Sequence, residues 1–125
     1  APPLLLSRAV PLGLLLAEDR NRLDEAAQRL SRAASIMPEN PRIHFNLGVA
    51  YWQLEQRDKA ASSIKTAYAL QPENPEFPQT LAQLYAQSEQ WEDALPFAER
   101  AAGLMPGNPQ AQAFLQEIRA RSRQR

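Results

Sequence analysis

The chain has 125 residues, of which 14 are basic and 14 acidic, and it contains no cysteine. The balanced charge provides no overall field that would attract nucleic acid or an anionic membrane. The lack of cysteine excludes disulfides, thiolate metal sites and cysteine nucleophiles, and it is compatible with a cytoplasmic or a bacterial envelope location. A chain of this length is expected to form a single domain, residues 1–125, with its own core.

The N-terminal segment is rich in leucine. The run is interrupted by Arg8, Pro11 and Gly13 and is too short to span a bilayer. It has about the length of the apolar part of a signal sequence. It also leads without a break into the next helical pattern, which favours a folded helix that begins at Pro11. Residues 1–9 are then expected to be extended or loosely packed.

These leucines also predict association. Seven leucines between residues 4 and 16 cannot all face one neighbouring helix, and each one buried elsewhere gains about 1.5–3 kcal/mol. We therefore expect burial against a second copy, against another part of a longer chain, or against a partner. A twofold homodimer would let the same patch cover itself. The residues expected at this contact are Leu5, Leu6, Leu12, Leu15 and Leu16.

A 34-residue interval runs through the rest of the chain. Its clearest mark is an Asn-Pro dipeptide that occurs three times, at Asn40-Pro41, Asn74-Pro75 and Asn108-Pro109. A fixed period of this length indicates stacked copies of one supersecondary unit. Asparagine is a good helix N-cap, and proline suits the first helical position. Helices are therefore expected to begin at Pro41, Pro75 and Pro109.

Residues 10–40 are predicted to form an irregular first repeat. Its second helix should run from Leu23 to Pro38, because small and apolar residues recur there at helical spacing. Leu12-Gly13 resembles Leu47-Gly48, but it precedes its alanine by one residue more. We therefore expect one extra residue in a turn at residues 19–22.

Residues 41–74 form the central copy. An amphipathic pattern predicts a helix from Pro41 to about Glu55, a polar turn over residues 55–58, and a second helix that Pro72 stops. Small residues mark where the two helices should touch, because they let helix axes approach closely. Gly48 and Ala60 are the residues expected at this crossing, and Ala60 is expected to be almost fully buried.

Residues 75–108 repeat the scheme with alanine in place of the glycine. Ala94 should be buried at the crossing, and Trp91 should plug the seam between the two helices. Pro78 lies in the first turn and should cost little. Pro96 lies deeper in its helix, where a proline costs about 3 kcal/mol or more. It should either kink the helix or face outward.

Residues 109–125 are predicted to form a capping helix and a basic tail. The helix should run from Pro109 to about Ser122, with one polar and one apolar face, as the end of a repeat array requires. The arginines near the end are expected to form a frayed, solvated tail; contact with an acidic partner or with nucleic acid is the alternative.

The repeated residues resemble the tetratricopeptide repeat, a 34-residue helix–turn–helix unit. The positions that carry the resemblance in the central copy are Leu47, Gly48, Tyr51, Ala60, Ala67 and Pro72, and those in the next copy are Leu81, Ala82, Tyr85, Ala94, Ala101 and Pro106. The resemblance implies an all-α fold: an α-solenoid of stacked antiparallel helix pairs in a right-handed superhelix, closed by the C-terminal capping helix.

Side chains that could support catalysis or hold a cofactor are sparse. His44 is the only histidine, and its position on a helix favours a structural role. The acidic pairs are sequence neighbours, which do not face each other on a helix, so they fit solvated faces better than an acid–base dyad. No glycine-rich phosphate loop is present. The sequence predicts a protein that is not an enzyme and has no cofactor, metal or small-molecule substrate.

The first helices of such repeats line the concave side of the stack, where a ligand would bind. Apolar residues there would mark a binding surface, unless the Leu12–Leu16 segment buries them as core; both alternatives stay open. The predicted ligand-binding residues are Arg42, Phe45, Asn46, Val49, Trp52, Gln53, Gln79, Gln83 and Gln87.

Three functions are then considered. The first is an interaction scaffold that binds a peptide segment or a partner helix, for example during assembly of a complex. The second is an interaction or oligomerisation module of a longer chain. The third is single-stranded RNA binding, which the balanced charge and the few basic residues on the inner face disfavour. Some tetratricopeptide proteins clamp a peptide carboxylate with lysine and asparagine, but the matching positions here are Phe45, Val49 and Thr80, which excludes that ligand class.

Overall fold

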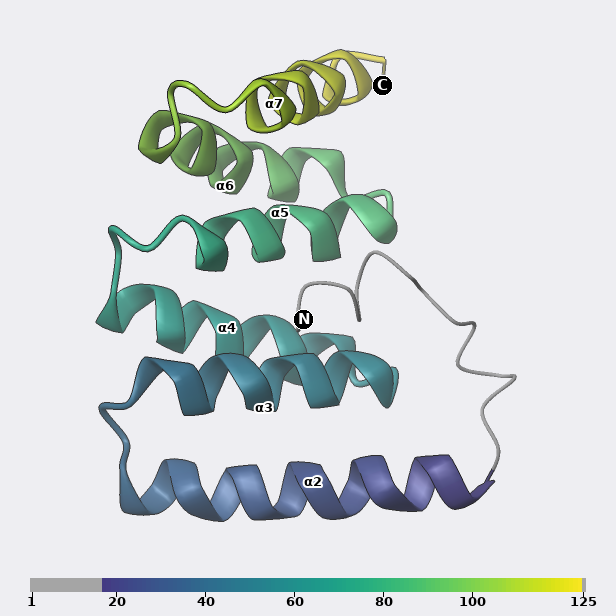
Figure 1. Cartoon of the computed structure of the whole chain (residues 1–125). Helices are drawn as coiled ribbons and strands as arrows, with labels where there is room; N and C mark the ends of the chain where they lie inside the picture. Colours follow the sequence, from purple (N-terminus) through teal and green to yellow (C-terminus); the bar gives the residue numbers. More distant parts are fainter. Residues whose placement is uncertain (1–16, 125) are drawn as a thin grey trace. The chain divides into compact units, whose positions relative to one another are not determined.

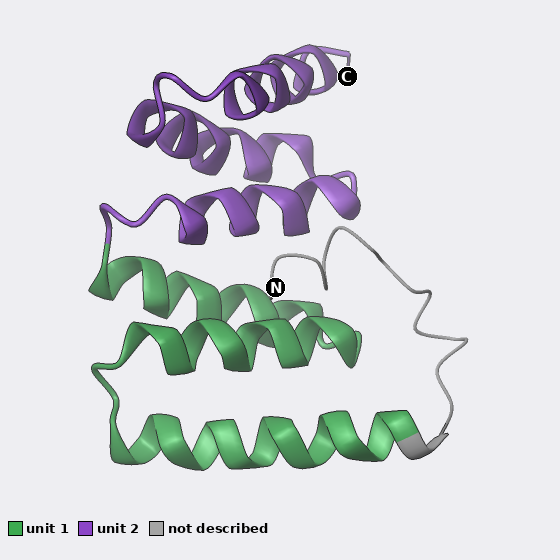
Figure 2. Ribbon diagram, in the orientation of Figure 1, with its two compact units in different colours: residues 1–71 green, residues 72–125 purple. Residues whose placement is uncertain are grey.

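The computed structural model describes residues 17–124, and the leucine-rich segment with its predicted helix and self-association residues lies outside them. The described residues form helices α2 to α7 (Figure 1). The chain divides into two compact units, Ala1–Gln71 and Pro72–Arg125 (Figure 2). An all-α helical repeat is therefore confirmed. No helix within residues 17–124 is both long and apolar enough to cross a membrane.

Unit 1 contains α2 (Ala17–Ile36), α3 (Pro41–Gln53) and α4 (Arg57–Leu70), with α3 packed against both of the others (Figure 1). Ala27, Leu47 and Ala50 form a buried cluster between α2 and α3. Leu30, Tyr51 and Leu54 are among the partly buried residues that pack on this cluster. The small residues on α2 and α3 let the two backbones approach.

The predicted turn at residues 19–22 is wrong, because α2 is one continuous helix of 20 residues. Its sequence contains neither proline nor glycine, so nothing interrupts the hydrogen-bond ladder. Arg22 lies 4.0 Å from Asp19 one turn earlier, an ion pair that suits a helix surface. The extra residue expected from the comparison of Leu12-Gly13 with Leu47-Gly48 therefore does not form a turn at residues 19–22.

The crossing of α3 and α4 is as close as the sequence predicts. Ala60 is fully buried, and Gly48 faces it across the helix pair. A Cβ atom on Gly48 would lie 3.0 Å from the Ala60 carbonyl oxygen and would collide with Ile64 Cγ1. Glycine is therefore needed at this position for space, since its backbone is ordinary helix.

Asparagine side chains cap the helices that follow the Asn-Pro dipeptides. Asn40 Oδ1 accepts hydrogen bonds from the backbone N–H groups of Arg42 and Ile43 at 3.0 and 3.3 Å. Asn108 does the same for Gln110 and Ala111. Helices α3 and α7 begin at the predicted prolines. The helix after Asn74 begins one residue later than predicted, at Glu76, whose N–H donates to Asn74 Oδ1 at 3.0 Å.

The turn inside each helix pair uses a glutamate in the left-handed backbone region. Glu55 has φ 62° and Glu89, one period later, has φ 56°. Gln56 N–H donates to the Tyr51 carbonyl at 2.9 Å, which closes the end of α3. Because the reversal is complete at residue 55, α4 begins at Arg57, two residues inside the predicted polar turn.

Unit 2 contains α5 (Glu76–Gln87), α6 (Trp91–Leu104) and α7 (Pro109–Ser122). Its core is built on small residues, with Ala82, Ala94, Ala98 and Ala102 buried together with Leu115 and Ile118. Tyr85 and Phe97 stack beside this core with ring centroids 5.9 Å apart. The burial of Ala60 and Ala94 confirms both predicted crossings.

Two prolines, Pro78 and Pro96, lie inside helices at the positions that the sequence predicts. Pro78 stands in the first turn of α5 and is buried. Pro96 lies inside α6, which continues through it, and the ring is exposed. An outward-facing proline leaves the carbonyl one turn earlier open to solvent, which lowers the cost of the missing hydrogen bond.

Two polar side chains at matching positions tie a helix to the loop before it. His44 Nε2 lies 2.8 Å from the Pro38 carbonyl oxygen, which confirms its structural role. Gln112, two periods later, donates from Nε2 to the carbonyls of Ala102 and Met105 at 3.1 and 3.3 Å. Gln112 thereby caps the end of α6.

Candidate functional site

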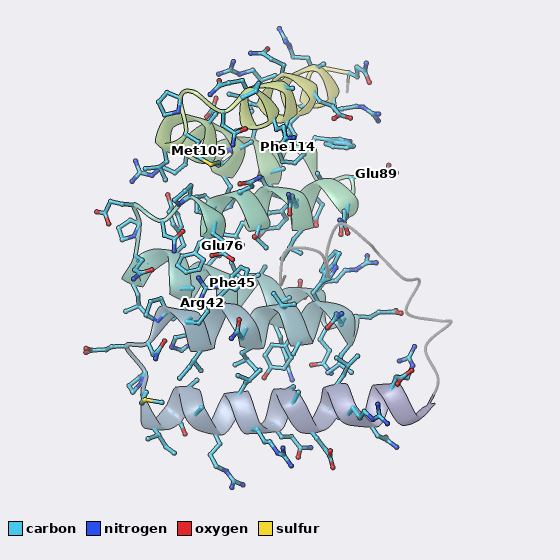
Figure 3. The ribbon with its side chains drawn as sticks, viewed as in Figure 1. Arg42, Phe45, Glu76, Glu89, Met105 and Phe114 are labelled. Carbon is cyan, nitrogen blue, oxygen red and sulfur yellow. The ribbon has the colours of Figure 1, made fainter. Side chains whose placement is uncertain are left out.

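The predicted site residues of unit 1 separate into buried and accessible groups. Phe45 and Val49 are only 1% and 5% exposed, so burial is the one of the two open alternatives that the structure shows, and neither side chain is accessible to a ligand. Arg42, which Figure 3 labels beside Phe45 on α3, is exposed and holds its guanidinium 5.1 Å from the Phe45 ring centroid. Apolar periodicity alone cannot tell a binding face from a second buried face on the same helix.

Three further residues of α3 keep some solvent contact. Asn46, Trp52 and Gln53 are partly buried. The Trp52 ring is covered by Arg57 from the start of α4, with 5.5 Å between the guanidinium carbon and the ring centroid. A cation over an indole face is a favourable pair, worth about 0.5–1 kcal/mol at an exposed site. Trp52 is thus held in place by the turn between α3 and α4.

The glutamine row on α5 reaches a pocket in unit 2. Gln79 and Gln83 are partly buried and Gln87 is exposed. Gln83 and Gln87, one turn apart, line a pocket of about 180 Å³ with Ala86 between them. The other walls are Trp91 from α6 and Phe114 and Glu117 from α7. Helices α5, α6 and α7 therefore contribute to one small pocket with two aromatic walls, two amides and one carboxylate.

Packing fixes the aromatic walls of this pocket. Trp91 and Phe114 are partly buried and pack against the core cluster of Ala82, Ala94 and Leu115. Figure 3 labels Phe114 on the capping helix. The predicted seam role of Trp91 is thus confirmed, but its ring also lines a pocket. Because each ring rests on core atoms, the pocket walls are formed before any ligand arrives.

One side of the Trp91 ring is engaged by an arginine. The Arg121 guanidinium carbon lies 5.1 Å from the Trp91 ring centroid, and Arg121 Nη2 lies 3.8 Å from Glu117 Oε2. Arg119 lies 3.7 Å from Glu99, and Arg123 Nε donates to the Arg119 carbonyl at 3.2 Å. The prediction of a frayed basic tail is therefore wrong for residues 119–122, which belong to α7 and have intramolecular partners.

Sequence reasoning missed the pocket for an identifiable reason. Trp91 opens a second helix, so the repeat scheme assigned it to the seam, and Phe114 stands in the apolar stripe of the capping helix. The residue that indicates the pocket in the sequence is Ala86, which lies 34 residues after Trp52 and so occupies the same position in its repeat. A small residue at a rim position that holds a large one elsewhere indicates an opening.

Two further hollows lie in unit 1. One, of about 320 Å³, lies beside α2 and the α3–α4 turn, and its walls include Asp24, Tyr51 and Lys59. The other, of about 800 Å³, is open and lies along the loop between α2 and α3, from Met37 to Arg42, with Gln71 at its edge. Both lack the pair of packed aromatic walls found in unit 2.

The positions that match the peptide-carboxylate clamp of some tetratricopeptide proteins hold no cation. Phe45, Val49 and Thr80 are all buried, with exposures of 1%, 5% and 6%. They can contribute neither a charge nor an accessible amide to a ligand. The geometry agrees with the absence of that clamp.

Paired helices repeated at 34 residues define a helical-repeat protein. A sequence profile described as TPR repeat matches residues 19–55, and one described as tetratricopeptide repeat matches residues 55–118. The chain therefore belongs to the tetratricopeptide repeat family. A comparison with curated proteins gives no match.

Several solved structures share this fold. One is the first tetratricopeptide domain of Spaghetti (RPAP3) bound to the HSP90 peptide SRMEEVD, with 24% identity over 82% of this chain and 81% of that one, and a TM-score of 0.70. Another is the Yersinia enterocolitica secretion chaperone SycD with a peptide of the translocator YopD, with 17% identity, 84% and 86% coverage, and a TM-score of 0.72. A protein of Thermus thermophilus has 26% identity, covers 94% and 58%, and gives 0.74.

Proposed function

We propose that this chain is a non-catalytic interaction scaffold that binds a peptide segment of a partner protein along the first helices of its repeats. The observation that carries the proposal is the pocket of unit 2, where the predicted glutamines Gln83 and Gln87 meet the rings of Trp91 and Phe114. Aromatic walls supply contact area, and amides can pair with a peptide backbone. This combination suits an extended polypeptide.

Two structural neighbours support the class of ligand. The RPAP3 domain and SycD have this fold and each was solved with a peptide. The specific ligand does not carry over, because the positions that would hold a peptide carboxylate are buried apolar residues and a threonine. The accessible residues that we assign to binding are Arg42, Asn46, Trp52 and Gln53 on α3 and Gln79, Gln83 and Gln87 on α5.

Peptide selection tests the proposal. The immobilised chain is used to select short peptides from a random library, and the enriched peptides are titrated against the wild type and the Gln83→Ala/Gln87→Ala variant. We expect a clear consensus and about tenfold weaker binding by the variant, equivalent to about 1.4 kcal/mol. Gln116→Ala, an exposed change elsewhere on α7, is the control and should bind normally. Failure to enrich any peptide, or equal binding by all variants, would refute the scaffold.

We also propose that the chain self-associates through Leu5, Leu6, Leu12, Leu15 and Leu16. The support is the density of leucine in residues 4–16. Sedimentation at micromolar concentration should show a dimer that the Leu5→Ser/Leu15→Ser variant disrupts. A monomer in both cases would rule out this contact.

A further inference from the structure

The unit 2 pocket has the size and chemistry of a site for one side chain. Its volume of about 180 Å³ is below the range of about 300–1,000 Å³ that is usual for whole small-molecule ligands. Two walls are aromatic rings, Trp91 and Phe114, and the charged group in the wall is the carboxylate of Glu117. Ring faces carry negative charge density and attract cations. The Glu117 carboxylate beside these rings also favours a positively charged ligand.

The neighbourhood of the pocket also opposes an anion. Glu92 and Asp93 are exposed in the first turn of α6, immediately after Trp91. A helix N-terminus attracts negative charge, but at α6 these two carboxylates already supply it. Gln83 and Gln87 offer amide oxygens that can accept hydrogen bonds. An incoming negative group would meet the Glu117 carboxylate in the pocket wall, whereas a positive group can pair with it.

The protein already places a guanidinium on the same groups. Arg121 lies 5.1 Å from the Trp91 centroid and 3.8 Å from the Glu117 carboxylate. Arg121 does not line the pocket itself. Trp91 and Glu117 therefore hold an arginine at the edge of the pocket, which indicates that they can accommodate a planar cation. A flat guanidinium can stack on a ring and reach a carboxylate through its fork of N–H groups, which an ammonium cannot.

We infer that the unit 2 pocket recognises one arginine side chain of the bound peptide, which stacks between Trp91 and Phe114 and pairs with Glu117. This inference rests on the proposed peptide-binding function and names its specificity. Arg121 competes with the ligand for Glu117, so it tunes the affinity. Ala86 leaves the space for the side chain to enter.

The test uses the peptides selected on the wild-type chain. We expect an invariant arginine in the consensus, and replacement of that arginine by citrulline, which keeps the shape and removes the charge, should weaken binding at least tenfold. Glu117→Gln should weaken the arginine peptide by about tenfold and leave the citrulline peptide unchanged, because a hydrogen-bonded charge pair of this kind corresponds to about that factor. Arg121→Gln should strengthen binding about two- to fivefold.

Controls separate this inference from the scaffold proposal. Glu117 and Arg121 are both exposed, so their variants should keep the wild-type melting temperature. The Glu117→Gln/Arg121→Gln variant removes the competitor and should still bind weakly, which assigns the loss to Glu117. Selected peptides that need Gln83 and Gln87 but contain no conserved arginine, or that prefer lysine, would overturn the arginine assignment and leave the scaffold intact. Failure to select any peptide would overturn both.

Discussion

The helix pairs α3–α4 and α5–α6 solve the same packing problem with different residues. At the crossing, Gly48 and Ile64 in the first pair correspond, one period later, to Ala82 and Ala98 in the second. All four residues are buried. In the first pair the large side chain, Ile64, lies on α4 and faces a glycine on α3. In the second pair α5 and α6 each contribute one methyl group. The motif therefore accepts different side chains at the crossing, provided that a large side chain on one helix faces a residue without a Cβ on the other.

The rims of the two pairs differ in a way that matters for function. Trp52 in the first pair lies under Arg57, 5.5 Å away. The corresponding residues of the second pair are Ala86 and Trp91, which line an open pocket. With the tryptophan at the start of the second helix instead of the end of the first, the rim holds an open pocket in place of a ring covered by an arginine. A repeat can thus keep its core and change its surface.

The largest expected effect comes from the exchange of volume at the first crossing. Ile64→Ala should lower the free energy of unfolding by about 2–5 kcal/mol because it leaves a cavity. Gly48→Ala alone should cost about 1 kcal/mol, since its Cβ collides with Ile64 while helix propensity returns part of the loss. The Gly48→Ala/Ile64→Ala variant has the two alanines of the second pair. Urea unfolding should show that it loses less free energy of unfolding than the two single variants lose together. Strict additivity would contradict volume exchange.

Overpacking should give the next largest effect. Ala60→Leu and Ala94→Leu should each cost about 1–3 kcal/mol, because both alanines are fully buried at crossings. Ala60→Leu should cost more, since Gly48 marks a closer approach of the helices. Ala69→Leu, an exposed change on α4, is the control and should leave the urea midpoint unchanged. A tolerated leucine at position 60 would show that the pairs are loosely packed.

The part of the fold that the sequence predicts well is set by local rules. The caps at Asn40 and Asn108 and the small crossing residues each follow from one residue and its neighbours. The missed features depend on a second element. The burial of Phe45 cannot be inferred from α3 alone, and the pocket at Trp91 requires three helices to converge. The continuity of α2 follows from its uninterrupted helical sequence, which the repeat register does not represent.

The smallest expected effect is a gain in stability at the turns. Glu55 and Glu89 have positive φ, a backbone conformation that costs a residue with a Cβ about 1–3 kcal/mol. Glycine avoids this cost, but its unfolded state is more flexible, which takes back part of the gain. Glu55→Gly and Glu89→Gly should each raise stability by about 0.5–1 kcal/mol. Glu39→Gly, in a loop with ordinary φ, should lower it slightly. Thermal unfolding of the three variants checks the comparison, and a loss at both turns would show that the glutamates stabilise them.

The central claim is that the open rim of unit 2 binds the partner peptide. Ala86→Trp places at this rim the tryptophan that stands at the same register position in the first pair, and Ala113→Trp adds the same side chain at an exposed position on α7. The measurement is the affinity of a peptide selected on the wild-type chain for both variants, with melting temperatures confirming the fold. We predict at least a tenfold loss for Ala86→Trp, about 1.4 kcal/mol or more, and no loss for Ala113→Trp. Equal affinity for the two variants would contradict the account.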